Sequence, residues 1–123
     1  MYPSGFISLP STSPMAFLTR TEELILLAVW NLQDNAYGAA IRDYLSQVSG
    51  HDWSIGAIYI PLDRLAHKGY VRSFKGDPTP QRGGRSKRFF KLTAEGVAAL
   101  TRIRRVQDAL WEGLPPLAFG GTE

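Results

Sequence analysis

Three runs of helix-spaced apolar residues, followed by two alternating segments, constrain the fold of this chain more than any other feature. Over 20–32, 37–49 and 55–68, apolar residues recur at intervals of three and four, which places them on one face of an α-helix. Residues 70–74 and 88–92 instead alternate apolar and polar side chains, as half-buried strands do. The sequence therefore predicts three helices followed by a two-stranded β-hairpin.

Capping residues support these boundaries and predict one more helix. Thr19 and Glu22 have the spacing of a capping box at the start of the first helix. Ser54 is placed to cap the third helix and Thr93 to cap a final one. Over 94–114, side chains spaced four and three residues apart form a heptad seam, which is typical of paired helices. The predicted dimer contacts on this seam are Leu100, Ile103, Gln107, Leu110 and Leu114.

The composition excludes several classes of protein. A length of 123 residues is that of one domain, and the absence of cysteine excludes a disulfide framework, a thiolate metal site and a cysteine nucleophile. No apolar run reaches membrane-spanning length and no basic residue precedes Arg20, so neither a membrane span nor a secretory signal is expected. His51 and His67 lie in no catalytic or metal-binding motif. We expect a cytoplasmic protein that is not an enzyme and binds no metal or cofactor.

The charges are distributed unevenly along the chain. The formal net charge is only +3, but residues 1–63 carry −4, residues 64–105 carry +10 and residues 106–123 carry −3. A basic block of this size within one domain indicates an anionic polymer or surface as partner. A basic face that contacts only solvent is the alternative explanation.

The order of the predicted elements is that of a winged helix-turn-helix, a mainly α (α+β) fold that binds double-stranded DNA. In this fold the third helix enters the major groove and the hairpin, or wing, lies along the backbone or minor groove. The chain then divides into a flexible arm (1–17), a winged-helix DNA-binding domain (18–93), a C-terminal dimerisation helix (94–114) and a tail (115–123).

The third helix has two different faces in a helical projection. Its predicted core stripe consists of Ile55, Ile58, Leu62 and Leu65, with Tyr59 and Ala66 at the border. The opposite side carries Gly56, Ala57, Ile60, Arg64, His67 and Lys68. Its small residues would allow close approach to DNA, and Ile60 suits a thymine methyl group. Alternatively, Ile60 packs on the arm or the wing.

Pro61 falls inside this third helix. A proline there removes the hydrogen bond to the carbonyl of Ala57 and crowds that carbonyl, which predicts a bend between the two residues. Either the bend redirects the first turn of the helix toward the groove, or the proline is tolerated because the helix starts late.

The segment between the two strands is the most basic stretch of the chain. Its glycines let the backbone approach a phosphate, and its arginines can enter a narrow minor groove. The predicted DNA contacts in and beside this segment are Lys75, Arg82, Gly83, Arg85 and Lys87. A solvated loop with no role in binding is the alternative.

Four local patterns carry a resemblance to a known family. They are Asp34-Asn35-Ala36-Tyr37-Gly38, Gly56-Ala57-Ile58-Tyr59 with Leu62-Asp63-Arg64-Leu65, Lys68-Gly69-Tyr70-Val71, and Arg82-Gly83-Gly84-Arg85-Ser86-Lys87-Arg88-Phe89-Phe90-Lys91-Leu92-Thr93. With these patterns in order over residues 18–114, the chain resembles the PadR family of winged-helix transcriptional regulators.

The resemblance implies a dimeric repressor that binds a palindromic operator and pairs its subunits through the C-terminal helix. It also implies that Tyr37 touches a phosphate, and that Ser54, Ala57 and Tyr59 face the groove or the backbone. The helical projection disagrees on Tyr59, because it places this side chain beside the core.

An effector site is a further implication of the resemblance. Some relatives bind flat aromatic compounds in a pore at the dimer interface, which relieves repression, and Gln107 and Trp111 lie one turn apart where they would face such a pore. Alternatively, Trp111 only covers the dimer interface. A rival function is a winged-helix module that binds protein or RNA without operator specificity.

Overall fold

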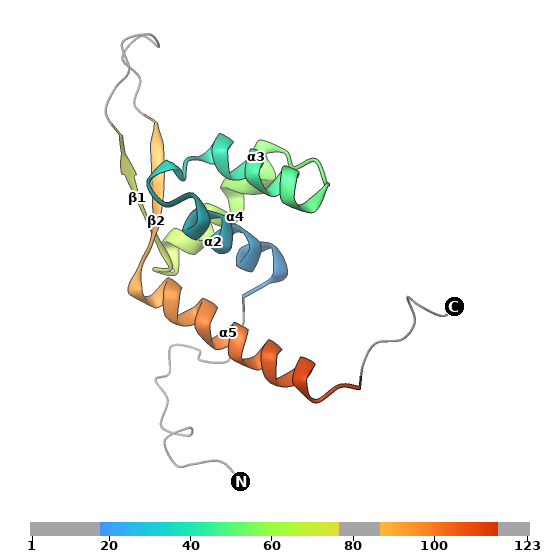
Figure 1. Cartoon of the computed structure of the whole chain (residues 1–123). Helices are drawn as coiled ribbons and strands as arrows, with labels where there is room; N and C mark the ends of the chain where they lie inside the picture. Colours follow the sequence, from blue (N-terminus) through green and yellow to red (C-terminus); the bar gives the residue numbers. More distant parts are fainter. Residues whose placement is uncertain (1–17, 77–86, 116–123) are drawn as a thin grey trace.

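The computed structural model describes residues 18–76 and 87–115 (Figure 1). Its elements in chain order are α2 (Arg20–Leu32), the short 3-10 helix η1 (Gln33–Asn35), α3 (Gly38–Ser49), α4 (Ile55–His67), β1 (Val71–Lys75), β2 (Arg88–Leu92) and α5 (Ala94–Glu112). This order confirms the predicted mainly helical, winged helix-turn-helix fold, with α4 as the third helix of the core.

The helices begin at the predicted capping residues. The Thr19 hydroxyl accepts a hydrogen bond from the Glu22 N–H at 3.1 Å, and the Glu22 carboxylate accepts one from the Thr19 N–H at 2.9 Å, which completes the capping box. The hydroxyls of Ser54 and Thr93 each accept one backbone N–H at 3.1 Å. Local sequence therefore determines where these helices start.

A shared apolar core lies among α2, α3, α4 and the hairpin. Helix α2 contributes Ile25 and Leu26, α3 contributes Ile41, and strand β2 contributes Phe90, all fully or almost fully buried. Ile58, Leu62 and Leu65 of α4 have no exposed surface, so the predicted stripe is confirmed at these positions. Burying each such side chain contributes about 1.5–3 kcal/mol.

Ile55 is the one member of the predicted stripe that the structure places outside the core. Its side chain is 39% exposed, which makes that part of the prediction wrong. Ile55 is the first residue of α4, and side chains in a helix lean toward its N-terminus. The side chain therefore extends past the end of the core, where none of the described elements covers it fully.

Pro61 lies well inside α4, which runs without a break from Ile55 to His67. The explanation that the helix starts late is therefore wrong. Pro61 itself is buried, whereas Ala57, whose carbonyl loses its helical donor, is exposed. The residue whose carbonyl loses its donor therefore belongs to the exposed side of α4. The bend between the two residues stays a prediction.

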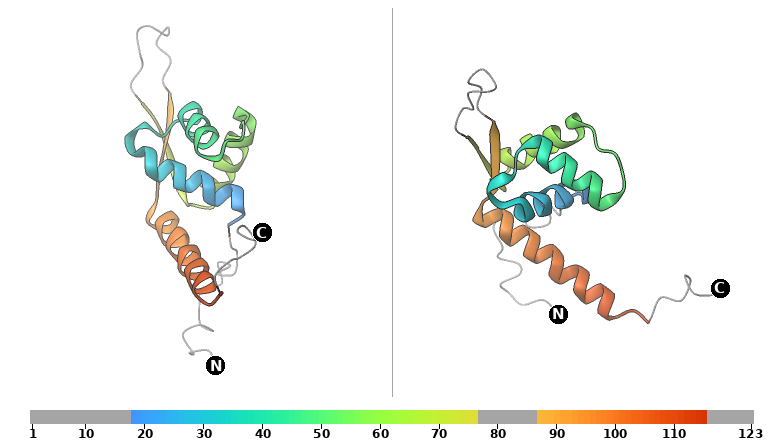
Figure 2. Two further views of the ribbon diagram at one scale, coloured as in Figure 1. Left: turned by 45° about the vertical axis from the view of Figure 1, so that its right-hand side comes forward. Right: turned by 45° about the horizontal axis from the view of Figure 1, so that its top comes forward.

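The hairpin is an antiparallel pair in which Val71 lies opposite Leu92 and Lys75 lies opposite Arg88. Val71 and Phe90 face the core while Arg72 and Lys91 are exposed, as the alternation predicts. The hairpin stands beside the helices. Helix α5 runs along α2 on the side away from α3, and its last turns extend away from the domain (Figures 1 and 2). No helix within the described residues is long and apolar enough to cross a membrane.

Candidate nucleic-acid interface

The residues around the centre of the exposed face of α4 are small or apolar. Ile60 is 63% exposed, and both Gly56 and Ala57 are exposed one turn before it. The position of a Cβ atom on Gly56 meets no other atom of the described residues within 4 Å. The Ser54 side chain is exposed but already accepts a hydrogen bond from Ala57. This face offers little steric resistance to a base-pair edge, as the sequence predicts for a helix that enters a groove.

Tyr59 lies on a flank of this face, between α4 and its neighbours. The side chain is half-buried, and its ring centroid is 6.4 Å from that of Phe90. Its hydroxyl lies directly over Gly38, so closely that a Cβ there would overlap the tyrosine ring. The projection that placed Tyr59 beside the core is confirmed, and its hydroxyl reaches the first turn of α3. Whether it contacts DNA stays a prediction.

Aromatic rings at the loop end of the hairpin strands, where the basic segment of the wing begins, join this segment to the start of α3. Phe89 stacks on Phe74 with ring centroids 5.9 Å apart and meets the edge of Tyr37 at 5.5 Å. The Lys87 ammonium lies 4.1 Å from the centroid of the Tyr37 ring, a cation–π contact. We call Tyr37, Phe74, Lys87 and Phe89 the wing-foot cluster. It brings two predicted DNA contacts, Tyr37 and Lys87, into one place beside the N-terminus of α3.

A backbone link holds the same two elements together. The Phe90 N–H donates to the Ala36 carbonyl at 2.8 Å, and Tyr37 and Phe89 form an isolated β-bridge. The loop end of β2 is thereby fixed relative to the start of α3. Phe89 and Phe74 were not among the predicted site residues. The aromatic side chains at this end of both strands are the sequence signal that would have identified them.

Arg64 and Lys68 lie on the opposite flank of α4 and share one partner. Arg64 Nε and Lys68 Nζ contact the same Glu22 oxygen at 3.4 and 3.2 Å. The two basic side chains are 53% and 43% exposed, whereas Glu22 is only 2% exposed. The two predicted DNA contacts are therefore held together at the C-terminal end of the exposed face.

The environment of Glu22 favours its charged form. Burial raises the pKa of this carboxyl, but the Thr19 backbone N–H, Lys68 and Arg64 together outweigh burial and leave the pKa below its ordinary value of 4.5. The negative charge is therefore retained at neutral pH inside a nearly closed site.

This arrangement predicts a pH-dependent contribution of Glu22 to stability. Because the folded-state pKa is lowered, the contribution is complete above pH 4.5 and is lost as the pH falls through the folded-state value. Glu22→Gln should lower the free energy of unfolding at pH 7 by about 1.5–3 kcal/mol, as for hydrogen bonds to charged groups. Urea titrations of both proteins from pH 7 to pH 3 should show this difference shrinking below pH 4.5. A constant difference would contradict the assignment.

Acidic residues from the segment 1–63 pair with the basic block. Asp63 of α4 contacts Arg88 of β2 at 3.3 Å, and Asp34 of η1 contacts Lys91 at 3.7 Å. These pairs are exposed and contribute little to stability. They do partly neutralise two of the basic side chains of β2.

Three of the predicted contacts, Arg82, Gly83 and Arg85, lie outside the described residues. Lys75 and Lys87 flank that segment, and both are exposed at the end of the hairpin. Their positions place the entry to the basic segment beside the wing-foot cluster.

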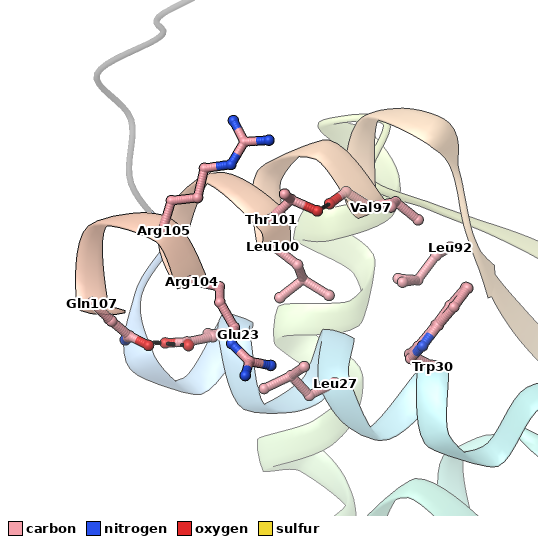
Figure 3. A pocket seen from close by; sticks show the side chains of 10 residues that line it. All are labelled: Glu23, Leu27, Trp30, Leu92, Val97, Leu100, Thr101, Arg104, Arg105 and Gln107. Atoms are coloured by element: carbon pink, nitrogen blue, oxygen red, sulfur yellow. Dashed lines mark hydrogen bonds between the residues drawn. The ribbon is translucent and has the colours of Figure 1, made fainter. Parts of the chain in front are cut away.

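A pocket of about 480 Å³ opens between α2 and α5 (Figure 3). Its apolar lining includes Leu27, Trp30 and Leu100. Gln107 lies at one end, where its side-chain amide donates to the Glu23 carboxylate at 3.3 Å. Arg104 points into the same space from α5. Of the two residues predicted for an effector, Gln107 lines this pocket, whereas Trp111 is not among its lining residues.

Trp30 is the aromatic residue that the pocket contains. It is 52% exposed and belongs to α2, and it lies next to Leu92 in Figure 3. The sequence does not single it out, because the helical spacing of α2 alone does not show which side of this helix meets α5.

The predicted dimerisation seam divides into two halves along α5. Leu100 packs against the core and Ile103 and Gln107 are half-buried, so the first half is partly used within the chain. Beyond them Leu110 is 66% exposed, with Trp111 beside it at 62%. Leu114 is 52% exposed, but α5 ends at Glu112 and does not include this last residue of the predicted seam. The second half therefore presents large apolar side chains that the described residues of the chain leave more than half exposed.

Comparisons with known proteins agree with this geometry. The model of the transcriptional regulator PadR-like family matches residues 26–102. A complex structure of hsRosR is 26% identical, with 79% of each chain covered and a TM-score of 0.65. A PadR family transcription regulator from Clostridium difficile is 20% identical over 76% of this chain and 93% of that one, with a TM-score of 0.62. One from Eggerthella lenta is 23% identical over 73% and 76%, with a TM-score of 0.59. No curated protein matches the chain in sequence.

Proposed function

Because this chain belongs to the PadR-like family of transcriptional regulators, a family of DNA-binding proteins, we propose that it is a repressor that acts as a homodimer on a palindromic operator. The winged-helix domain over 18–93 would read DNA, and the segment over 94–114, which contains α5, would pair the subunits. An N-terminal arm over 1–17 and a tail over 115–123 complete this proposed organisation.

One observation carries the proposal for DNA reading. The exposed face of α4 is centred on Ile60. It has Lys87 of the wing-foot cluster on one side and Arg64 with Lys68 on the other. Base edges are read by side chains in the groove, while cations on either side contact the phosphates that border it. The small apolar centre and the flanking cations match these two tasks.

The exposed second half of α5 supports the proposal for a homodimer. Val106, Leu110 and Trp111 are 41%, 66% and 62% exposed, and exposed large apolar residues that gather on one part of a helix often mark an interaction surface. A second copy related by two-fold symmetry would cover the same surface on both subunits. Two recognition helices in fixed relation would then require a two-fold symmetric operator.

A small aromatic effector is a further part of the proposed function. We place its binding at Gln107 and Trp111 of α5, with the pocket between α2 and α5 directly adjacent. A flat ligand would stack on an exposed indole and hydrogen-bond to the amide. Quenching of tryptophan fluorescence on addition of planar aromatic compounds, absent in Trp111→Leu, would support this site, and quenching that persists unchanged in Trp111→Leu would contradict it.

The experiment that tests the main proposal is selection of bound duplexes from a random DNA pool by the full chain. A repressor dimer should enrich a palindrome whose half-sites are about one helical turn apart. Reporter expression from a promoter carrying that palindrome should fall when the protein is present. Enrichment of no sequence, or stronger binding to RNA of the same pool, would favour the rival function, a winged-helix module without operator specificity.

The basic segment of the wing allows a quantitative prediction. Replacing Arg82 and Arg85 together by Ala should weaken DNA binding and lower the salt dependence, by about 0.9 in the slope of log K against log salt for each phosphate that is no longer neutralised. Titrations at several salt concentrations measure this slope. Arg102→Ala with Arg105→Ala, two exposed cations on α5, form a control of equal charge change. An unchanged slope in the wing variant would remove the wing from the binding mechanism.

A further inference from the structure

Glu22 is a buried charged side chain whose two carboxylate oxygens both have partners. One oxygen accepts from the Thr19 N–H at 2.9 Å. The other accepts from Lys68 at 3.2 Å and from Arg64 at 3.4 Å. With 2% exposure, the carboxylate has almost no contact with solvent. The hydrogen bond from Thr19 and the contacts with Lys68 and Arg64 therefore hold the carboxylate in one position.

The position of Glu22 is set by α2 and not by α4. Glu22 is the third residue of α2 and a member of its capping box, so the backbone of the first turn fixes its side chain. It precedes the segment 26–102 that matches the family model. The carboxylate that α2 holds therefore meets two long basic side chains, Arg64 of α4 and Lys68 at its C-cap, and restricts their conformations.

Arg64 and Lys68 keep donors that can reach a second anion. Arg64 meets Glu22 through Nε, which leaves the terminal amino groups of its guanidinium for other acceptors. Both side chains are about half exposed, on the same flank of α4 as Ala57. The cluster of one anion and two cations retains a net positive charge, so it still attracts a phosphate.

We propose that Glu22 is a positioning residue for DNA binding: it holds Arg64 and Lys68 in the conformations in which they contact the DNA backbone beside the recognition helix. This inference rests on the proposed DNA contacts of Arg64 and Lys68. Holding these side chains in place before binding removes part of the ordering cost that each would otherwise contribute on complex formation.

Positioning and simple neutralisation have opposite consequences for DNA affinity. If Glu22 only cancelled positive charge, Glu22→Gln would add one positive charge per subunit and tighten DNA binding, with a steeper salt dependence. If Glu22 positions the cations, the same change should weaken binding roughly threefold to tenfold despite the added charge. The slope of log K against log salt should also become shallower, because fewer phosphates are then neutralised.

The experiment measures the affinity of the full chain for a mixed-sequence DNA duplex at several salt concentrations. The variants are the single substitutions Glu22→Gln and Glu22→Asp, the double variant with Arg64→Gln and Lys68→Gln, and the triple variant that adds Glu22→Gln to this pair. Asp43→Asn is the matched charge control, since Asp43 is exposed on α3 and pairs with its neighbour Arg42. Thermal unfolding of each free protein sets a temperature at which all are folded.

We expect Glu22→Gln to weaken binding, and to have no further effect once Arg64 and Lys68 are replaced. Tighter or unchanged binding by Glu22→Gln, with a clear loss in the Arg64 and Lys68 pair, would overturn the positioning role and leave the proposed DNA contacts standing. Full affinity and an unchanged salt slope in the Arg64 and Lys68 pair would instead overturn those contacts, and the positioning role with them.

Discussion

Ile60→Glu is expected to abolish sequence-specific DNA binding while leaving the protein folded. Ile60 is 63% exposed at the centre of the α4 face, with Gly56 and Ala57 beside it, so a longer side chain meets no core residue. On DNA, a carboxylate there would replace the apolar contact with a base and lie close to phosphates. Juxtaposed like charges cost several kcal/mol, which corresponds to a loss of affinity of about 100-fold or more.

Fluorescence anisotropy with the selected duplex, together with thermal unfolding of the free protein, measures both parts of this prediction. Val48→Glu is the matched control. Val48 is 66% exposed on the last turn of α3 and undergoes a similar change in charge and size. Its variant should bind nearly as well as the original protein. Retention of binding by Ile60→Glu, or an equal loss in Val48→Glu, would show that α4 does not enter the groove as proposed.

Leu110→Asp is expected to convert the protein to monomers and to weaken operator binding by about 10²- to 10⁴-fold, the gain that a linked second site provides. Leu110 is 66% exposed, so its replacement disturbs little within the chain. At a two-fold interface the substitution would bury two carboxylates against apolar surface, which is strongly unfavourable. Each monomer would then bind a single half-site without the contribution of its partner.

Light scattering and sedimentation of Leu110→Asp give the oligomeric state, and titration of the palindromic duplex gives the affinity. Ala98→Asp introduces the same charge at an exposed position on the first part of α5, outside the heptad seam. This control should remain dimeric. A dimer that persists in Leu110→Asp would show that the seam is not the interface, while monomers from both variants would indicate a general effect of charge on α5.

Much of the fold could be predicted because its signals are local. Thr19, Ser54 and Thr93 cap the helices as expected, since a cap satisfies N–H groups only two or three residues away. The alternation in 88–92 placed Phe90 in the core for a similarly local reason. The exposure of Ile55 could not be predicted in this way, because a helical projection has no information on where the core ends along the helix.

The candidate site was predicted only in part. Ile60 and Lys87 were predicted as DNA contacts, and the structure leaves both side chains exposed. The role of Phe89 depends on its contact with Tyr37, a residue far away in the sequence. The pairing of Glu22 with Arg64 and Lys68 joins positions 42 and 46 residues apart. No periodicity in the sequence indicates such contacts.

By itself, the sequence determined the order of the elements, the helix starts, the basic block and the resemblance to PadR regulators. Each of these depends on short-range hydrogen bonding, on side-chain periodicity or on composition, which act within a few residues. Only the tertiary structure decided that a carboxylate of the first helix is buried against two cations of α4, and that Trp30 faces the pocket beside α5. These facts depend on how helices pack against one another, because burial and charge pairing arise between elements and not within them.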